Sequence, residues 1–150
     1  MLITEDTNII IDHARKVFDA EIHCLEAVRE NIDAHFAESV RAILDCQGRI
    51  VLSGIGKSAI VAQKITATLN STGSPALFMH AADAIHGDLG IIQPNDIVIL
   101  LSKSGNSPEI KELIPYLKKM GNKIIAIVSN LHSVLAHDAD IVLHIPVERE

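Results

Sequence analysis

Residues 96–109 read DIVILLSKSGNSPE, in which an unbroken apolar run leads directly into a loop that carries three serines and a glycine. A continuous apolar run of this length is typical of a strand whose two faces are both covered. Ser107 can act as the N-cap of a following helix, with Pro108 at its first position. The segment therefore predicts a buried strand over 96–101, a polar loop, and a helix over 107–120.

Strands and helices alternate along the rest of the chain. Apolar runs predict four further strands, at 49–53, 75–79, 123–128 and 140–145. The spacing of apolar residues predicts helices at 5–33, 36–44, 57–71, 83–87 and 132–137. Because alternating strands and helices with short connections form right-handed crossovers, the sheet is expected to be parallel. We predict one α/β domain over residues 1–150, a three-layer α/β/α sandwich with a five-stranded parallel sheet and additional N-terminal helices.

The composition limits the classes of function. A net charge of −6 argues against a general nucleic-acid binder, which usually presents a basic face. No apolar run approaches the roughly 18–20 residues that span a membrane, and the first residues lack the basic start and apolar stretch of a signal peptide. Cys24 and Cys46 have no CxxC spacing, so we expect buried free thiols rather than a disulfide or a metal site. These features predict a cytoplasmic protein with neither nucleic acid nor membrane as a partner.

Polar residues gather at the places where a ligand is expected. In an open parallel sheet, ligands bind outside the carboxyl ends of the strands, at the point where the strand order reverses. Four segments follow strand ends in this chain: 53–58, 79–88, 101–109 and 145–150. Glu150 is a solvated chain end by default, and only its place at this edge of the sheet makes it a candidate.

The serine loop is the best candidate for a phosphate site. A capped helix start explains Ser107, but it leaves Ser102 and Ser104 without a role. Hydroxyls and backbone N–H groups that converge at a helix start bind phosphate without needing an arginine. We therefore expect Ser102, Ser104 and Ser107 to bind a phosphate group.

Residues 53–58 (SGIGKS) form a second candidate for binding an anion. Gly54 and Gly56 allow a tight turn and close approach of an anion to the backbone, and the following helix start favours negative charge. The segment is neither a full Walker A motif nor a full GxGxxG motif, so a plain strand–helix turn is the alternative. Lys57 favours the ligand-binding interpretation.

Two histidines follow the second predicted strand. His80 and His86 lie near Asp83 and Asp88, and histidine is the side chain that exchanges protons near neutral pH. Ordinary surface histidines are the alternative. A metal site from His80, His86 and Asp88 is a further alternative, although the spacing matches no standard structural zinc pattern.

These segments together resemble the SIS (sugar isomerase) domain and, more narrowly, the D-arabinose 5-phosphate isomerases of the KpsF/GutQ family. The SxSGxS pattern indicates a SIS domain, and the HGDLG block beside GxGKS narrows the resemblance. The segments that carry it are 54–58 (GIGKS), 71–75 (STGSP), 84–90 (AIHGDLG) and 102–110 (SKSGNSPEI).

The resemblance implies a flavodoxin-like SIS fold and an aldose–ketose isomerase. Members of this family interconvert D-arabinose 5-phosphate and D-ribulose 5-phosphate, which supplies the precursor of the lipopolysaccharide sugar Kdo. They require no cofactor and assemble as homodimers or homotetramers. The resemblance places catalysis at Lys57, His86, Glu109 and Glu150. It places phosphate and substrate binding at Gly54, Gly56, Ser58, Gly73, Ser74, His80, Ser102, Ser104 and Ser107. It also associates His80 with an inhibitory zinc ion.

The chain departs from the family at its C-terminal side. Family members usually continue into a Pro- and Thr-rich loop, further helices with a histidine before a Gly-Gly turn, and, in longer members, paired CBS domains. We therefore expect an isomerase of this kind or its catalytic-core fragment. In the proton transfer, Glu109, Glu150 or His86 is the base, and Lys57 stabilises the enediolate. The alternatives are a non-catalytic sugar-phosphate sensor and a 6-phospho-3-hexuloisomerase.

Overall fold

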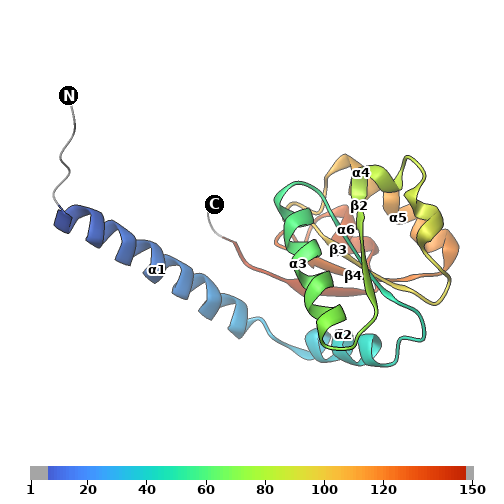
Figure 1. Cartoon of the computed structure of the whole chain (residues 1–150), viewed down its shortest axis with the longest axis horizontal. Helices are drawn as coiled ribbons and strands as arrows, with labels where there is room; N and C mark the ends of the chain where they lie inside the picture. The colour runs from blue at the N-terminus through green and yellow to red at the C-terminus, as the bar shows by residue number, and fades with distance from the viewer. Residues whose placement is uncertain (1–6, 148–150) are drawn as a thin grey trace.

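The computed structural model describes residues 7–147 and contains a single all-parallel sheet of five strands in the order β2-β1-β3-β4-β5 (Figure 1). The strands are β1 (Ile50–Gly54), β2 (Ala76–His80), β3 (Ile97–Leu101), β4 (Lys123–Val128) and β5 (Ile141–His144). Each agrees with its predicted range to within two residues. The predicted α/β class and parallel sheet are therefore confirmed.

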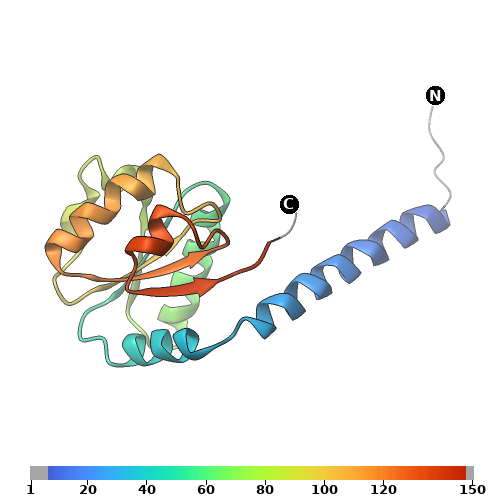
Figure 2. The same cartoon turned by 180° about the vertical axis from the view of Figure 1, so that it is seen from behind.

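Helices cover both faces of the sheet (Figure 2). The helices are α1 (Thr7–Glu30), α2 (Ala34–Leu44), α3 (Lys57–Ser71), α4 (Ala81–Ala84), α5 (Pro108–Met120) and α6 (Val134–Asp138), with a 3₁₀ turn η1 (Asp88–Ile91). Side chains of α2 and α3 pack on one face, and those of α4, α5 and α6 pack on the other. Neighbouring residues of β3 enter opposite clusters, Val98 on the α5 side and Ile99 on the α3 side. This packing is the reason that the strands are continuous apolar runs.

Two details differ from the predicted helices. The short helix expected at 83–87 lies earlier, at Ala81–Ala84, and the turn η1 was not predicted. Gly87 has a φ of +136°, which is incompatible with a helix continuing through it. At the N-terminus, Asp33 separates the two helices by capping α2, since its carboxylate accepts the N–H groups of His35 and Phe36.

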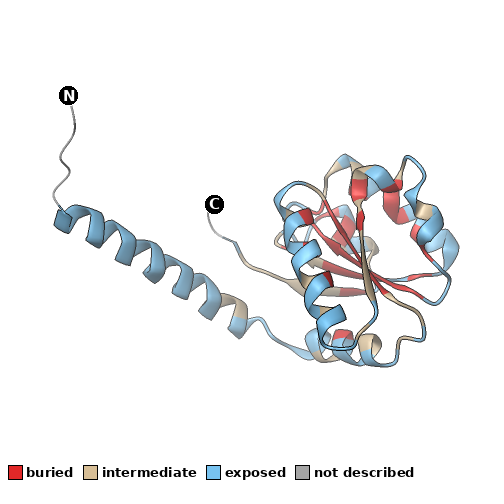
Figure 3. Ribbon diagram, in the orientation of Figure 1, coloured by how far each residue is buried: buried red, intermediate tan, exposed pale blue. Residues whose placement is uncertain are grey.

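Helix α1 differs from the others in having no buried residue, and it projects away from the sheet (Figure 3). The prediction that both cysteines are buried is wrong for Cys24, which is exposed on α1; Cys46 is half-buried and also free. Apolar spacing identifies one side of a helix, but packing decides whether that side is covered. Among the described helices, none is long and apolar enough to cross a membrane.

Candidate functional site

The strand order creates a crevice between the carboxyl ends of β1 and β3. From β1 the chain passes to β2 at one edge, and from β3 it passes to β4 on the other side, so the connections diverge there. A cleft of about 440 Å³ lies at this point. Its lining includes Ser58 from the start of α3, Ser102, Ser104 and Ser107 from the serine loop, and Ser129 and Asn130 from the loop after β4.

Hydrogen bonds within the serine loop fix its shape. The Ser102 hydroxyl accepts the N–H of Gly105 at 3.1 Å and lies 3.1 Å from the Ser107 hydroxyl. The Ser104 hydroxyl accepts the N–H of Asn106 at 3.2 Å. Ser102 therefore also has a structural role, because its hydrogen bonds hold the loop together. Ser107 occupies the N-cap position of α5 as predicted, but its hydroxyl faces Ser102 and makes no capping hydrogen bond.

Two backbone N–H groups of the serine loop, which lines the cleft, have no hydrogen-bond acceptor among the described residues. Gly105 has a left-handed conformation, with a φ of +62°. Within residues 7–147, the backbone N–H groups of Ser104 and Ser107 donate to no protein acceptor. The N–H groups of Gly105 and Asn106, which lie between them in the chain, donate to the Ser102 and Ser104 hydroxyls, so the two open donors flank the left-handed residue. Together with the start of the 13-residue helix α5, they provide neutral donors suited to a phosphate group.

A second loop supports the serine loop from the side of β4. The carbonyl of Lys103 accepts the N–H groups of Ser129 and Asn130 at 3.1 and 3.3 Å, and the carbonyl of Gly105 accepts the N–H of Leu135 at 3.1 Å. Ser129 and Asn130 thereby form a wall of the cleft, and neither was a sequence candidate. The available signal was that both are polar and directly follow a predicted strand.

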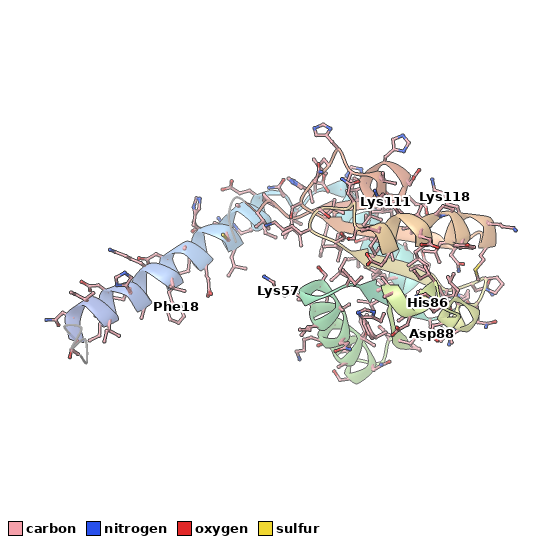
Figure 4. All side chains as sticks on the ribbon, turned by 90° about the horizontal axis from the view of Figure 1, so that it is seen from above. Phe18, Lys57, His86, Asp88, Lys111 and Lys118 are labelled. Carbon is pink, nitrogen blue, oxygen red and sulfur yellow. The ribbon has the colours of Figure 1, made fainter. Side chains whose placement is uncertain are left out.

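The turn between β1 and α3 forms the opposite side of the cleft. A Cβ at Gly54 would lie 3.0 Å from the carbonyl carbon of Ser58 and 3.1 Å from the carbonyl oxygen of Leu101. Gly56, the N-cap residue of α3, has a φ of +55°. Both glycines are therefore required by the local geometry. Lys57 is exposed at the start of α3 (Figure 4) and lines an adjoining hollow of about 250 Å³ together with Ser58, Ser102 and Ser129.

The other sequence candidates lie elsewhere. His80 ends β2, with its Nδ1 4.0 Å from an Asp83 carboxylate oxygen. His86 is exposed in the turn after α4, and Figure 4 shows His86 and Asp88 well apart from Lys57. Half-buried Glu109, in the first turn of α5, is not among the residues that line the cleft. A single chain therefore does not bring Lys57 and His86 together.

Three further predictions concern residues away from the cleft. Gly73 and Ser74 precede β2, so they lie at the amino edge of the parallel sheet, opposite the cleft. Within the described residues, no group of three or more His, Cys, Asp or Glu side chains could hold a metal ion, so a zinc ion at His80 stays a prediction. Glu150 lies outside the described residues.

Comparisons with known proteins agree with this architecture. An Escherichia coli CFT073 protein solved in complex with arabinose 5-phosphate superimposes with a TM-score of 0.93 at 39% identity, over 97% of this chain and 78% of that chain. The sugar isomerase domain of an RpiR transcription factor from Sphaerobacter thermophilus, at 22% identity and a TM-score of 0.80, shares the fold.

Several curated relatives of similar sequence are named arabinose 5-phosphate isomerases. Arabinose 5-phosphate isomerase KpsF of Escherichia coli O6:H1 is 43% identical over 94% of this chain and 43% of its own length. Arabinose 5-phosphate isomerase KdsD of Francisella tularensis is 40% identical over 93% of this chain and 44% of its own length. The chain thus spans less than half the length of these relatives. The family model of the SIS domain matches residues 43–150, so this chain belongs to the SIS domain family.

Proposed function

We propose that the cleft binds the phosphate of a pentose 5-phosphate, and that this chain forms the core of an isomerase that interconverts D-arabinose 5-phosphate and D-ribulose 5-phosphate. The observation that carries the proposal is the open donor set of the serine loop at the reversal point of the sheet. The names of the curated relatives and the arabinose 5-phosphate complex of a structural neighbour support the choice of substrate. D-Arabinose 5-phosphate would then serve as the Kdo precursor.

The cleft suits a phosphate because its donors are fixed before the ligand arrives. Ser104 and Ser107 both line the cleft, and Ser107 is the N-cap residue of α5, so their N–H groups and the Ser104 hydroxyl are available at the start of that helix. A dianion there interacts favourably with the helix dipole, by roughly 0.3–1 kcal/mol in exposed sites and more in sheltered ones. Hydrogen bonds to a charged acceptor each contribute about 1.5–3 kcal/mol.

The isomerisation needs a base and a group that stabilises negative charge. The base removes the proton from C2 of the aldose while O1 gains a proton, which gives a cis-enediol. A proton then returns to C1 and the O2 proton leaves, which gives the ketose. Because C1 is reduced as C2 is oxidised, no external electron carrier takes part. We assign Lys57 to stabilise the enediolate, since it lies beside the cleft. His86, Glu109 and Glu150 stay the candidate bases.

The direct test is to incubate the chain with D-ribulose 5-phosphate and to assay D-arabinose 5-phosphate. A longer version that includes the additional length of the relatives is tested in parallel. Turnover in either version supports the isomerase. Binding of the sugar phosphate without turnover in both versions would instead identify a sensor.

We expect Ser104→Ala to weaken binding of D-arabinose 5-phosphate by about 10- to 100-fold, because one charge-assisted hydrogen bond is lost. Isothermal titration calorimetry measures the change. Ser71→Ala is the matched control, since Ser71 is an exposed serine at the far end of α3. Equal affinities for the wild type and Ser104→Ala would show that the phosphate does not bind in the serine loop.

Replacing Lys57 with methionine should lower kcat by roughly 10²–10³-fold, the usual effect of removing one group that stabilises an oxyanion. KM should change much less, because the phosphate donors are retained. Steady-state kinetics of the active version measures both constants. Lys64→Met, an exposed lysine two turns further along α3, is the control. An unchanged kcat would remove Lys57 from the mechanism.

A further inference from the structure

We propose that His144 is a positioning residue for the candidate site, because its ring donates to the carbonyl of Ser129 and thereby fixes the cleft wall, which we define as Ser129 and Asn130. The inference rests on the proposed function for the ligand that the wall contacts. His144 is the last residue of β5, and it is not among the residues that line the cleft. It therefore acts on a ligand through the wall and not by direct contact.

The parallel register of β4 and β5 brings the His144 ring to the cleft wall. His144 lies opposite Val128, the last residue of β4. Ser129 follows Val128 in the chain, so its backbone lies one residue beyond the ladder and within reach of the ring. The Nε2 atom of His144 is 3.2 Å from the Ser129 carbonyl oxygen. Since a carbonyl oxygen only accepts, Nε2 carries the proton in this hydrogen bond.

Asn31 fixes the other side of the same ring. The Nδ1 atom of His144 is 3.2 Å from the side-chain oxygen of Asn31, which lies 113 residues earlier in the chain. The NH₂ group of Asn31 donates to the carbonyl of Ala27 at 2.8 Å, and this hydrogen bond turns the amide oxygen toward the ring. The ring makes both of its hydrogen bonds when each nitrogen carries a proton. A rotation of the ring would break the contacts on both sides.

Hydrogen bonds determine the orientation of the ring more than packing does. His144 is only half-buried, and it lines a groove of about 450 Å³ between the junction of α1 with α2 and the end of β5. Most residues that line this groove are apolar, as Phe36 and Leu143 are. Apolar side chains offer the ring nitrogens no hydrogen-bond partner, so the contacts with Asn31 and Ser129 set the position of the ring.

The contact with His144 completes the support of the cleft wall. The N–H groups of Ser129 and Asn130 donate to the carbonyl of Lys103 in the serine loop, at 3.1 and 3.3 Å. Ser129 is therefore held from the serine loop through its N–H and from β5 through its carbonyl. Without the second contact the wall gains freedom to move. A ligand would then have to order the wall on binding, which lowers its affinity.

Two substitutions of His144 separate the two contacts of the ring. In His144→Gln, the amide nitrogen can take the place of Nε2 and keep the hydrogen bond to Ser129. In His144→Asn, the shorter side chain brings its amide nitrogen to the place of Nδ1, so the hydrogen bond to Ser129 is lost.

We expect His144→Asn to raise the dissociation constant of D-arabinose 5-phosphate about three- to tenfold, the usual effect of losing one neutral hydrogen bond. His144→Gln should stay within about twofold of the wild type, because it retains the donor to Ser129. Isothermal titration calorimetry measures both affinities. In the active version, KM should follow the same pattern while kcat changes by less than about twofold, since Lys57 is retained.

Hydrogen exchange tests the same link without any ligand. The amides of Ser129 and Asn130 donate to Lys103, so their exchange rates report local opening of the wall. In His144→Asn these two amides should exchange about three- to tenfold faster than in the wild type or His144→Gln, while the amides of β3 keep their rates. NMR on the whole chain measures the rates. His23→Asn, at an exposed histidine of α1, is the matched control and should change neither exchange nor binding.

Three results would overturn the proposal. One is equal exchange of the wall amides in the wild type and His144→Asn. Another is a loss of affinity in His144→Gln as large as that in His144→Asn. The third is faster exchange throughout β3 in His144→Asn, which would show a general loss of stability. If neither version of the chain bound the sugar phosphate, the proposed function would fail, and the exchange rates would still decide whether His144 fixes the wall.

Discussion

Replacing Gly105 with alanine is expected to lower the free energy of unfolding by about 2–4 kcal/mol and to abolish binding of the sugar phosphate. Two effects combine. The left-handed conformation, with a φ of +62°, disfavours any side chain, and a Cβ would lie 2.5 Å from the Cβ of Ser133. Ser133 is buried and caps α6 by accepting the N–H of Ala136, so it cannot move aside without losing that cap.

The binding defect follows from the position of Gly105 in the loop. The N–H of Gly105 donates to the Ser102 hydroxyl, and its carbonyl accepts the N–H of Leu135. A shift of Gly105 therefore displaces the N–H groups of Ser104 and Ser107. Urea denaturation measures stability and calorimetry measures binding.

Gly121→Ala is the matched control for Gly105→Ala. Gly121 is also left-handed, with a φ of +79°, but a Cβ there meets nothing within 4 Å. Gly121→Ala should therefore show only the conformational cost, about 1–2 kcal/mol. Equal losses for the two variants would show that the contact with Ser133 is unimportant.

Replacing Asp96 with asparagine should destabilise the domain by about 2–3 kcal/mol near neutral pH. The buried Asp96 carboxylate joins the amino ends of β1 and β3. It accepts the backbone N–H groups of Arg49 and Gln93, both at 2.8 Å, and pairs with the Arg49 guanidinium at 2.7 Å. An asparagine has the same shape, but its NH₂ group would face one of these N–H donors in place of a carboxylate oxygen. That donor would then lack an acceptor. Arg49 is partly exposed, which limits the loss.

The effect of Asp96→Asn should depend on pH in a defined direction. Burial by itself raises the pKa of the Asp96 carboxyl, but the hydrogen bonds from Arg49 and from the N–H groups of Gln93 and Arg49 outweigh burial and hold the pKa below its usual value. The stabilisation is therefore complete above the unfolded pKa of about 3.9 and is lost as the pH falls through the lower, folded-state pKa.

Urea denaturation of the wild type and Asp96→Asn at several pH values measures this dependence. The difference in unfolding free energy should stay constant between about pH 5 and 8 and should shrink below about pH 4. Carboxylates common to both proteins cancel in the difference. Asp45→Asn, at an exposed position beside the same edge of the sheet, should have little effect. A difference that widened in acid would contradict the assignment.

The sheet could be predicted from the sequence because its signal is local. A strand covered on both faces must be apolar at every position, so the runs at β1, β3 and β4 stand out without knowledge of their neighbours. Ser107 and Pro108 likewise mark the start of α5 through the short-range geometry of helix ends. The turn η1 has no such periodic signal.

Local sequence patterns could not predict which other segments pack against each helix or strand. Apolar spacing identified the amphipathic side of α1, but no property of residues 7–30 alone reveals that the α/β body leaves this side exposed. The wrong prediction that Cys24 is buried has the same cause, because burial depends on which other segments pack against a residue.

The same distinction applies to the candidate site, where local patterns predict some features and packing decides others. The all-parallel α/β fold and the polar residues that follow its strands, including Lys57 and Ser104, can be predicted from local patterns, because these patterns arise between neighbours in the chain. Which of these residues share a cleft depends on how distant segments pack together. The order β1-β3-β4 brings Ser129 to the serine loop, while the parallel direction of β2 places Gly73 at the opposite edge and the path of the chain holds His86 apart from Lys57. Proximity between distant segments depends on strand order and packing, which no single stretch of sequence encodes.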